Sequence, residues 1–171
     1  MKRNIVLVGF MGSGKSTLGR LLQKELGWPL LSTDEYIEEQ EGRKIAQVFK
    51  DSGESHFRSL EHKAVEEITK GEKAVIIDCG GGVVLNPDNM KLLKKTGTLI
   101  YLSCDPDVIY ERIHMQPKRP LLDVPDPKAK IAMLLKERSP MYKQADITID
   151  TSDGDMARVA QEVIQKVVHG E

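Results

Sequence analysis

The sequence GFMGSGKST, residues 9–17, constrains the fold of this chain more than any other stretch. An apolar run at residues 5–8 precedes it and indicates a short buried strand, and leucines at helical spacing follow it over residues 18–26. Glycines let successive backbone N–H groups curl around an anion, and the start of a helix adds unpaired amides and a positive dipole end. A strand, a glycine-rich turn and a helix in this order predict a phosphate-binding loop.

The pattern G-x-x-x-x-G-K-[ST] in this loop further predicts a site for a nucleoside triphosphate. We expect Lys15 to reach the β and γ phosphates and the hydroxyl of Ser16 to hold Mg²⁺. The predicted nucleotide contacts from the loop and the helix start are Gly12, Ser13, Gly14, Lys15, Ser16 and Thr17.

Length and composition exclude several other classes. The chain has 171 residues, enough for one ordinary domain, and its formal charge of −1 argues against a nucleic-acid partner. No apolar run approaches the roughly 18 residues that a membrane span needs. The two cysteines, Cys79 and Cys104, have neither disulfide-framework nor metal-ligand spacing, which is typical of a reducing compartment. We expect one cytoplasmic domain over residues 1–171, with no membrane partner.

Strand and helix patterns alternate along the rest of the chain. Further strands are expected at residues 28–31, 75–77, 99–102 and 147–149. Helices are expected at about 88–95, at about 106–114, in a segment that ends at 142, and from about 155 onward. A longer helical stretch is expected over about 35–70, with breaks near Gly42 and Gly53. Hairpin turns are missing, so we predict a three-layer α/β/α fold around a five-stranded parallel sheet. Prolines in residues 115–127 predict an irregular flap. Ligands belong at the carboxyl ends of such strands.

The class of phosphate-loop protein has to come from other residues, because many functions share this fold. Residues 78–81 read DCGG, which matches the D-x-x-G of a GTPase, but no N-K-x-D guanine-reading motif occurs. A small-molecule kinase needs instead an acceptor pocket and mobile cations over the transferred phosphoryl group.

Six motifs in the same order make the chain resemble the shikimate kinase family, in the nucleoside-monophosphate-kinase-like branch of P-loop proteins. They are GFMGSGKST at 9–17, Asp34 as the second acid of a D-x-D, FRSLE at 57–61, GGG at 80–82, RPLL at 119–122 and ERSPMY at 137–142. The resemblance runs nearly end to end. It implies Mg²⁺-assisted transfer of the γ-phosphoryl group of ATP to the 3-hydroxyl of shikimate, a step toward chorismate and the aromatic amino acids. We expect the enzyme to be a monomer.

The resemblance also implies an acceptor site within about residues 33–61 and its neighbours. Arg58 and Arg138 would clamp the shikimate carboxylate, because planar guanidinium groups suit bidentate pairing. Asp34 would orient the attacking hydroxyl and take its proton. The other implied substrate residues are Phe49 and Phe57 as apolar walls, and Gly80, Gly81 and Gly82, whose amides could approach the substrate because no Cβ intervenes.

Two arginines are implied at the nucleotide, in or beside a mobile lid of about residues 112–127. Arg119 would swing onto the phosphates and offset charge in the transition state, as an arginine finger does. Arg112 would stack on adenine through its planar guanidinium. The implied catalytic residues are therefore Lys15, Asp34 and Arg119.

The chain departs from the family pattern at one place. The D-x-D reads Ser32-Thr33-Asp34, so the first acid, which helps to hold Mg²⁺, is absent. Asp78 stands two residues before the glycine triplet, where the family usually has Ser or Thr. Because the family places these two strands side by side, we hypothesise that Asp78 supplies the missing carboxylate, with Ser16 and Asp78 as the metal residues. A structural role, in which Asp78 only braces the glycine loop, would also fit the sequence.

Several of these residues also suit purely structural roles. Asp34 could only cap a helix, Arg58 and Glu61 could form an exposed i,i+3 pair, and Phe49 and Phe57 could be ordinary core. The chain as a whole could also be a kinase for another polyol acid such as gluconate, or a nucleotide-binding regulatory protein whose catalysis has lapsed.

Overall fold

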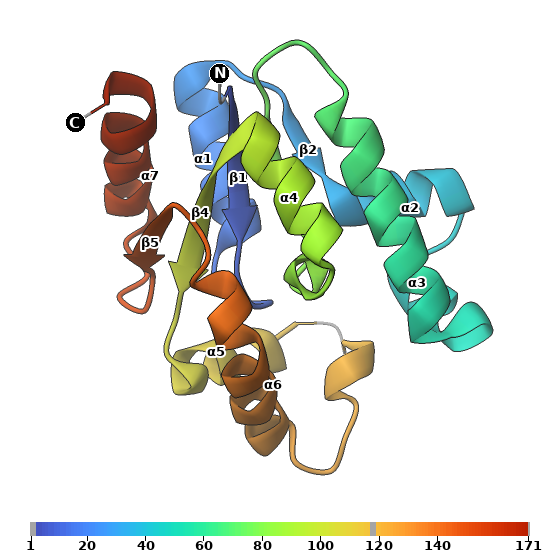
Figure 1. Cartoon of the computed structure of the whole chain (residues 1–171). Coiled ribbons are helices and arrows are strands. Elements are labelled where there is room, and N and C mark those ends of the chain that lie inside the picture. The colour runs from blue at the N-terminus through green and yellow to red at the C-terminus, as the bar shows by residue number, and fades with distance from the viewer. Residues whose placement is uncertain (1–2, 117–118, 171) are drawn as a thin grey trace.

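The computed structural model describes residues 3–116 and 119–170. Its centre is a parallel five-stranded sheet in the order β2-β3-β1-β4-β5 (Figure 1). The strands are β1 Asn4–Val8, β2 Leu30–Ser32, β3 Ile76–Asp78, β4 Gly97–Ser103 and β5 Ile147–Asp150. The predicted five-stranded parallel sheet is confirmed.

Helices connect the strands and cover both faces of the sheet (Figure 1). They are α1 Lys15–Leu26, α2 Thr33–Glu41, α3 Ile45–Thr69, α4 Pro87–Thr96, α5 Pro106–His114, α6 Pro127–Tyr142 and α7 Met156–Ile164. Short 3-10 turns occur at Val83–Leu85 and Pro120–Leu122, and a π-helical turn at Gln165–His169 follows α7. The second 3-10 turn gives the proline-rich flap more order than the sequence predicted.

Alternating side chains of β1 build the two halves of the core. Ile5 and Leu7 pack with residues of α1 and α7, whereas Val6 and Val8 pack with residues of α3 and α4. All four are fully buried, because a parallel strand between two helical layers has no face left for water. The three-layer α/β/α prediction is confirmed.

The breaks predicted in the long helical stretch have local causes. Gly42 ends α2 in the left-handed conformation with φ 65°, and Gly53 kinks α3 with φ 80° and ψ 172°, values that L-residues rarely adopt. At the other end of α2 the Ser32 Oγ accepts the Glu35 N–H at 3.2 Å. Ser32 is therefore the N-cap, and Asp34 lies in the first turn without capping it.

The carboxyl edge of the sheet gathers the segments that carry the motifs. β1 leads into the phosphate-loop sequence and β3 leads into the glycine triplet. Ser32 and Asp78 are direct partners in the β2–β3 register, so the expected neighbourhood of these two positions is confirmed. α5 and α6 lie beyond this edge (Figure 1). Within the described residues, no helix has the length and apolar character needed to cross a membrane.

Candidate active site

A cavity of about 770 Å³ opens at the carboxyl edge of the sheet. Its wall brings together sequence segments that lie more than 100 residues apart, from Gly12 to Arg138. The predicted site residues that line it are Gly12, Gly14, Lys15, Ser16, Thr17, Asp34, Phe49, Phe57, Arg58, Asp78, Gly80, Gly81, Gly82, Arg112, Arg119 and Arg138. Of the predicted set, Ser13 alone does not line the cavity.

Lys15 begins α1 and is held inside the curl of the loop. Its Nζ donates to the carbonyl oxygens of Gly9 at 2.8 Å and Phe10 at 3.0 Å. Burial lowers the pKa of Lys15, and the nearby charges of Asp78 and Asp34 act in the opposite direction. The ammonium group thus lies among the loop, Asp78 and Asp34, where a phosphate on the loop would meet it.

Backbone hydrogen bonds of Ser13 fix the conformation of the loop. Its amide donates to the carbonyl of Phe10 at 3.1 Å, and its own carbonyl accepts the Thr151 hydroxyl at 2.7 Å. Both residues are fully buried. The structure therefore gives Ser13 a buried, hydrogen-bonded place in the loop, and its predicted contact with the nucleotide stays a prediction.

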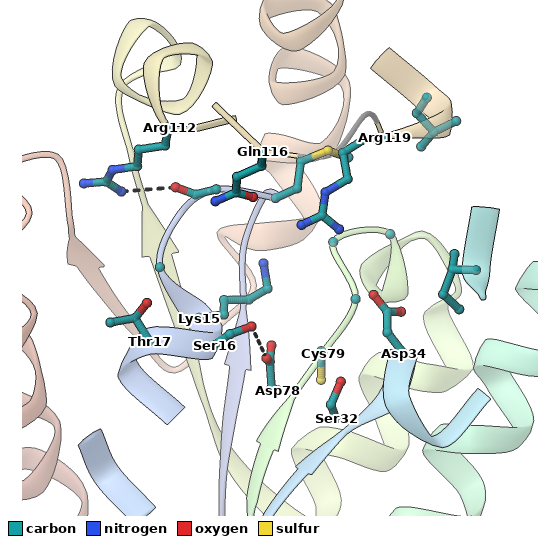
Figure 2. A pocket seen from close by; sticks show the side chains of 18 of the residues that line it. Lys15, Ser16, Thr17, Ser32, Asp34, Asp78, Cys79, Arg112, Gln116 and Arg119 are labelled. Carbon is teal, nitrogen blue, oxygen red and sulfur yellow. Dashed lines mark hydrogen bonds between the residues drawn. The ribbon is translucent and has the colours of Figure 1, made fainter. Parts of the chain in front are cut away.

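Ser16, in the first turn of α1, contacts Asp78 at the end of β3. The Ser16 hydroxyl donates to Asp78 Oδ2 at 2.6 Å, as Figure 2 shows. Hydroxyl and carboxylate oxygens are the ligand type that Mg²⁺ prefers, and the ion needs only one or two protein carboxylates because waters and phosphates complete its shell. No cluster of three or more His, Cys, Asp or Glu suited to a metal occurs among the described residues.

Asp34 presents a carboxylate with an unusual environment. Its Oδ1 is buried and finds no hydrogen-bond partner within the described part of the chain. Burial, followed by the charge of Asp78, raises the pKa of Asp34, while Lys15 and Arg119 lower it. A carboxylate with a raised pKa is a stronger base than one in water.

Arg58 lies between two acids of its own helix. Its Nη1 donates to Glu61 Oε1 at 2.9 Å and its Nη2 to Glu54 Oε1 at 3.2 Å. Glu61 is 1% exposed, so Arg58 and Glu61 do not form the exposed surface pair that the sequence also allowed. Burial is the main cause that raises the pKa of Glu61 to about 7, against the opposing charge of Arg58.

The two phenylalanines belong to a core cluster and also line the cavity. Phe57 is buried in a cluster with Ile37, Val48 and Ala64, and Phe49 packs against that cluster. Their ring centroids lie 4.6 Å apart, and the Arg58 guanidinium carbon is 5.2 Å from the Phe57 ring centroid. Both rings also line the cavity.

Charged side chains pack so closely against Gly80 and Gly82 that a larger residue would not fit at either position. A Cβ on Gly80 would lie 2.8 Å from Asp34 Oδ1 and 3.0 Å from Glu61 Oε2, and a Cβ on Gly82 would lie 2.5 Å from the Arg58 Cζ. The Gly80 amide donates to the Thr33 hydroxyl at 2.8 Å, so this N–H is already used within the protein. Gly80 and Gly82 thus make room for the groups that face the cavity.

Arg138 reaches the cavity from α6 although its sequence neighbours are polar. It is 3% exposed, and its guanidinium carbon lies 5.8 Å from the ring centroid of Phe10. Tyr142, one turn further along, donates its hydroxyl to the carbonyl of Gly81. The buried Tyr142 ring stacks on Tyr101, with centroids 5.0 Å apart. These contacts hold α6 against the glycine triplet, so Arg138 and Arg58 share one cavity.

Arg112 and Arg119 enter from the α5 side (Figure 2). Arg112 donates to the carbonyls of Gly12 at 3.1 Å and Thr151 at 2.6 Å, which ties the loop to the segment after β5. Arg119 is exposed and its guanidinium points into the cavity on the side of Lys15 in Figure 2. Residues 117–118 of the predicted lid lie outside the described residues.

Sequence reasoning missed several residues that organise this site. Glu61, Thr33, Thr151 and Tyr142 each contact a predicted residue, as described above. A signal for Glu61 is present in the sequence, because it falls on the apolar stripe of α3 with Phe57, Ala64 and Ile68. No local pattern marks Thr151, whose partner Ser13 is 138 residues away.

A phosphate-loop motif, a buried carboxylate and two arginines around one cavity are typical of a P-loop phosphotransferase that acts on a small anionic acceptor. The shikimate kinase family model matches residues 11–168. A shikimate kinase from Thermodesulfovibrio yellowstonii is 43% identical over 164 residues, which cover 96% of this chain and 94% of that protein. The structure of a shikimate kinase from Acinetobacter baumannii in complex with shikimate superposes with a TM-score of 0.93 and 35% identity, covering 100% of this chain and 96% of the other. This chain belongs to the shikimate kinase family.

A gluconokinase from Sinorhizobium meliloti has the same fold with a TM-score of 0.58, over 95% of this chain and 97% of the other. At 18% identity this likeness concerns the fold alone.

Proposed function

We propose that this chain phosphorylates the 3-hydroxyl of shikimate with ATP, a step toward chorismate and the aromatic amino acids. The observation that carries the proposal is the shared cavity of Lys15, Asp34, Arg58 and Arg138, in a chain of the shikimate kinase family. One end of this cavity suits phosphates and the other suits a compact ring acid. The binding of shikimate by the Acinetobacter baumannii relative supports the same acceptor.

The side chains divide the reaction among them. Arg58 and Arg138 bind the shikimate carboxylate and so fix the ring, with Phe49 and Phe57 beside it. Asp34 orients the 3-hydroxyl and accepts its proton as the oxygen attacks the γ-phosphorus. The γ-phosphoryl group leaves ADP, and Lys15 and Arg119 offset the negative charge that spreads over its oxygens.

We propose Ser16 and Asp78 as the residues that hold Mg²⁺ beside the phosphates. Held by these two residues, Mg²⁺ would supply positive charge that offsets the negative charge of the phosphates. The hydrogen bond of 2.6 Å between these side chains and the pairing of Ser32 with Asp78 support the carboxylate at position 78 as the one absent at position 32. Asp78 lies on β3, which pairs directly with β1 ahead of the loop.

We propose one domain over residues 1–171, with an acceptor-binding region of about 33–61 and a lid of about 112–127 that excludes water and so limits ATP hydrolysis. Arg112 would stack on adenine, and its bonds to Gly12 and Thr151 would hold the guanidinium plane in place. The proposal also includes a monomeric enzyme in the cytoplasm. The buried, unpaired Cys79 and Cys104 suit a reducing compartment.

Initial rates with different acceptors test the function. Purified protein with ATP and Mg²⁺ is assayed for ADP release with shikimate, with gluconate and with neither. We expect turnover with shikimate alone. Turnover with gluconate would replace the acceptor assignment, and nucleotide binding without turnover on either would favour a regulatory protein.

Reciprocal variants test the metal residues. We expect Asp78→Ser to weaken Mn²⁺ binding in the presence of ADP at least tenfold, measured by electron paramagnetic resonance, and Ser32→Asp added to it to restore much of that affinity. Asp78→Asn should raise the Mg²⁺ concentration needed for half-maximal activity. An unchanged metal dependence in Asp78→Asn would contradict this assignment and leave Asp78 as a brace for the loop.

A further inference from the structure

The backbone groups of the glycine triplet are hydrogen-bonded within the protein, with two exceptions. The carbonyls of Gly80 and Gly82 accept N–H groups of the 3-10 turn that follows. The Gly80 N–H donates to the Thr33 hydroxyl, and the Gly81 carbonyl accepts the Tyr142 hydroxyl. The N–H groups of Gly81 and Gly82 donate to no atom of the described residues. Because both glycines line the cavity, a ligand there can supply the missing acceptor.

The peptide that joins Gly81 to Gly82 has a defined direction. The described chain has no cis peptide bond, so the C=O and the N–H of this peptide point in opposite directions. The C=O points to the hydroxyl of Tyr142, which is fully buried and is not among the residues that line the cavity. The Gly82 N–H therefore points away from Tyr142, to the side on which the two glycines border the cavity.

Two guanidinium groups lie close to this N–H. A Cβ on Gly82 would lie 2.5 Å from Arg58 Cζ, and a Cβ on Gly81 would lie 3.7 Å from Arg138 Nη1. Both arginines and the backbone N–H are hydrogen-bond donors without any acceptor of their own. A carboxylate placed among them would accept from all three, so this N–H belongs to the carboxylate end of the acceptor site.

The backbone alone does not select this direction of the peptide. Gly82 has φ −95°, and a peptide turned over between Gly81 and Gly82 would give it a positive φ, which glycine adopts about as readily as a negative one. In the reversed peptide the Gly81 carbonyl oxygen would face the cavity and repel a carboxylate. A bond from a side chain is therefore needed to hold the peptide in the direction that the structure shows.

We propose that Tyr142 is a positioning residue for acceptor binding, because its hydroxyl holds the Gly81 carbonyl and so keeps the Gly82 N–H turned toward the shikimate carboxylate. The inference rests on the proposed function. It gives Tyr142 an effect on the acceptor that passes through one peptide of the backbone, without contact between the tyrosine and the substrate.

The surroundings of Tyr142 suit this role. Its ring stacks on Tyr101, with centroids 5.0 Å apart and planes inclined by 10°, so the hydroxyl is held in place. Burial raises the pKa of Tyr142 to about 12, and the charge of Arg138 acts in the opposite direction. The hydroxyl therefore keeps its proton at neutral pH and remains a donor to the carbonyl.

The variant Tyr142→Phe tests the role because it removes the hydroxyl and keeps the ring. We expect the KM for shikimate to rise roughly tenfold, as for the loss of one hydrogen bond to a charged group, with kcat and the KM for ATP little changed. Tyr101→Phe is the matched control. It removes a hydroxyl from the stacked ring, which forms no hydrogen bond with the triplet in the described part of the chain, so its kinetics should match the wild type.

Nuclear magnetic resonance can observe the peptide itself. Glycine labelled with carbon-13 at the carbonyl and nitrogen-15 at the amide gives a carbonyl-to-amide correlation only where two glycines are adjacent, which in this sequence occurs only in the triplet. The two signals are the amides of Gly81 and Gly82, and Gly82→Ala assigns them because it removes the second. Shikimate should move the Gly82 amide proton of the wild type downfield. Tyr142→Phe should shift the Gly81 carbonyl resonance and reduce that response to shikimate.

An unchanged KM for shikimate in folded Tyr142→Phe overturns the inference. A raised KM with a wild-type response of the Gly82 amide also overturns it, and assigns the effect to Arg138, whose charge acts on Tyr142. If Tyr142→Phe does not fold, the wild-type spectra decide, because a Gly82 amide proton that does not respond to bound shikimate contradicts the inference. If the wild type neither binds nor phosphorylates shikimate, the proposed function fails first and this inference with it.

Discussion

Replacement of Gly82 by alanine separates the function of Arg58 from the stability of the fold. The new Cβ would lie 2.5 Å from Arg58 Cζ and 2.6 Å from its Nη2, closer than real Cβ atoms approach any atom. The backbone at Gly82, with φ −95° and ψ 4°, accepts an alanine. Because the obstructed atoms are the end of a flexible side chain, the guanidinium should move aside while the fold stays intact.

The expected size follows from what Arg58 loses. A hydrogen bond to a charged group contributes about 1.5–3 kcal/mol, so displacement of the guanidinium should raise the KM for shikimate roughly 10- to 150-fold. The melting temperature should change by no more than a few degrees. A coupled assay of ADP release and a thermal melt measure the two quantities.

Two controls refine the test. Gly71→Ala, where a Cβ meets no atom nearer than 4.0 Å, reports the general effect of replacing a glycine. In an Arg58→Ala background, Gly82→Ala should cost less than twofold, because the side chain it displaces is gone. An unchanged KM in Gly82→Ala, or an equal loss in the Arg58→Ala background, would show that displacement of Arg58 is not the cause.

Three further substitutions should separate structural from catalytic roles. The pKa of Glu61 is raised to about 7 in the folded protein, whereas an unfolded Glu loses its proton near pH 4.5. The free energy of unfolding should therefore fall by up to about 3 kcal/mol between about pH 4.5 and 7. Melts across this pH range should show a smaller fall in Glu61→Gln, which has no proton to lose. Arg119→Ala should lower kcat about a thousandfold without altering the melting temperature, since Arg119 is exposed. Thr151→Val should weaken ATP binding and cost about 1 kcal/mol in chemical denaturation, because Ser13 loses its 2.7 Å bond.

Much of the fold was predictable because its signals are local. The alternation of strands and helices follows from apolar periodicity, and the breaks at Gly42 and Gly53 follow from conformations that favour glycine. Local signals do not predict the order of the strands in the sheet, because that order depends on pairing between distant segments. The family resemblance alone predicted that positions 32 and 78 lie close together.

The candidate site was predictable where a motif carries its chemistry and less so where packing decides. Lys15, Asp34 and Arg58 stand in recognisable patterns, and they line one cavity. Glu61 could be an exposed partner of Arg58 or a buried acid, depending on which face of α3 packs against the protein. The apolar stripe of that helix indicates the buried position once the packing of α3 is known. The motif predicts that Ser13 contacts the nucleotide, but it does not show that the side chain is fully buried.

The proposed reaction transfers the γ-phosphoryl group of ATP to the 3-hydroxyl of shikimate, with Asp34 as the base. Phosphorus and carbon NMR of the reaction products identify both the leaving group and the hydroxyl that is phosphorylated. We expect equal amounts of ADP and a single phosphate monoester at the 3-position, formed far more slowly by Asp34→Asn. ADP without phosphorylated shikimate, a phosphate on another hydroxyl, or full activity in Asp34→Asn would contradict the proposed reaction.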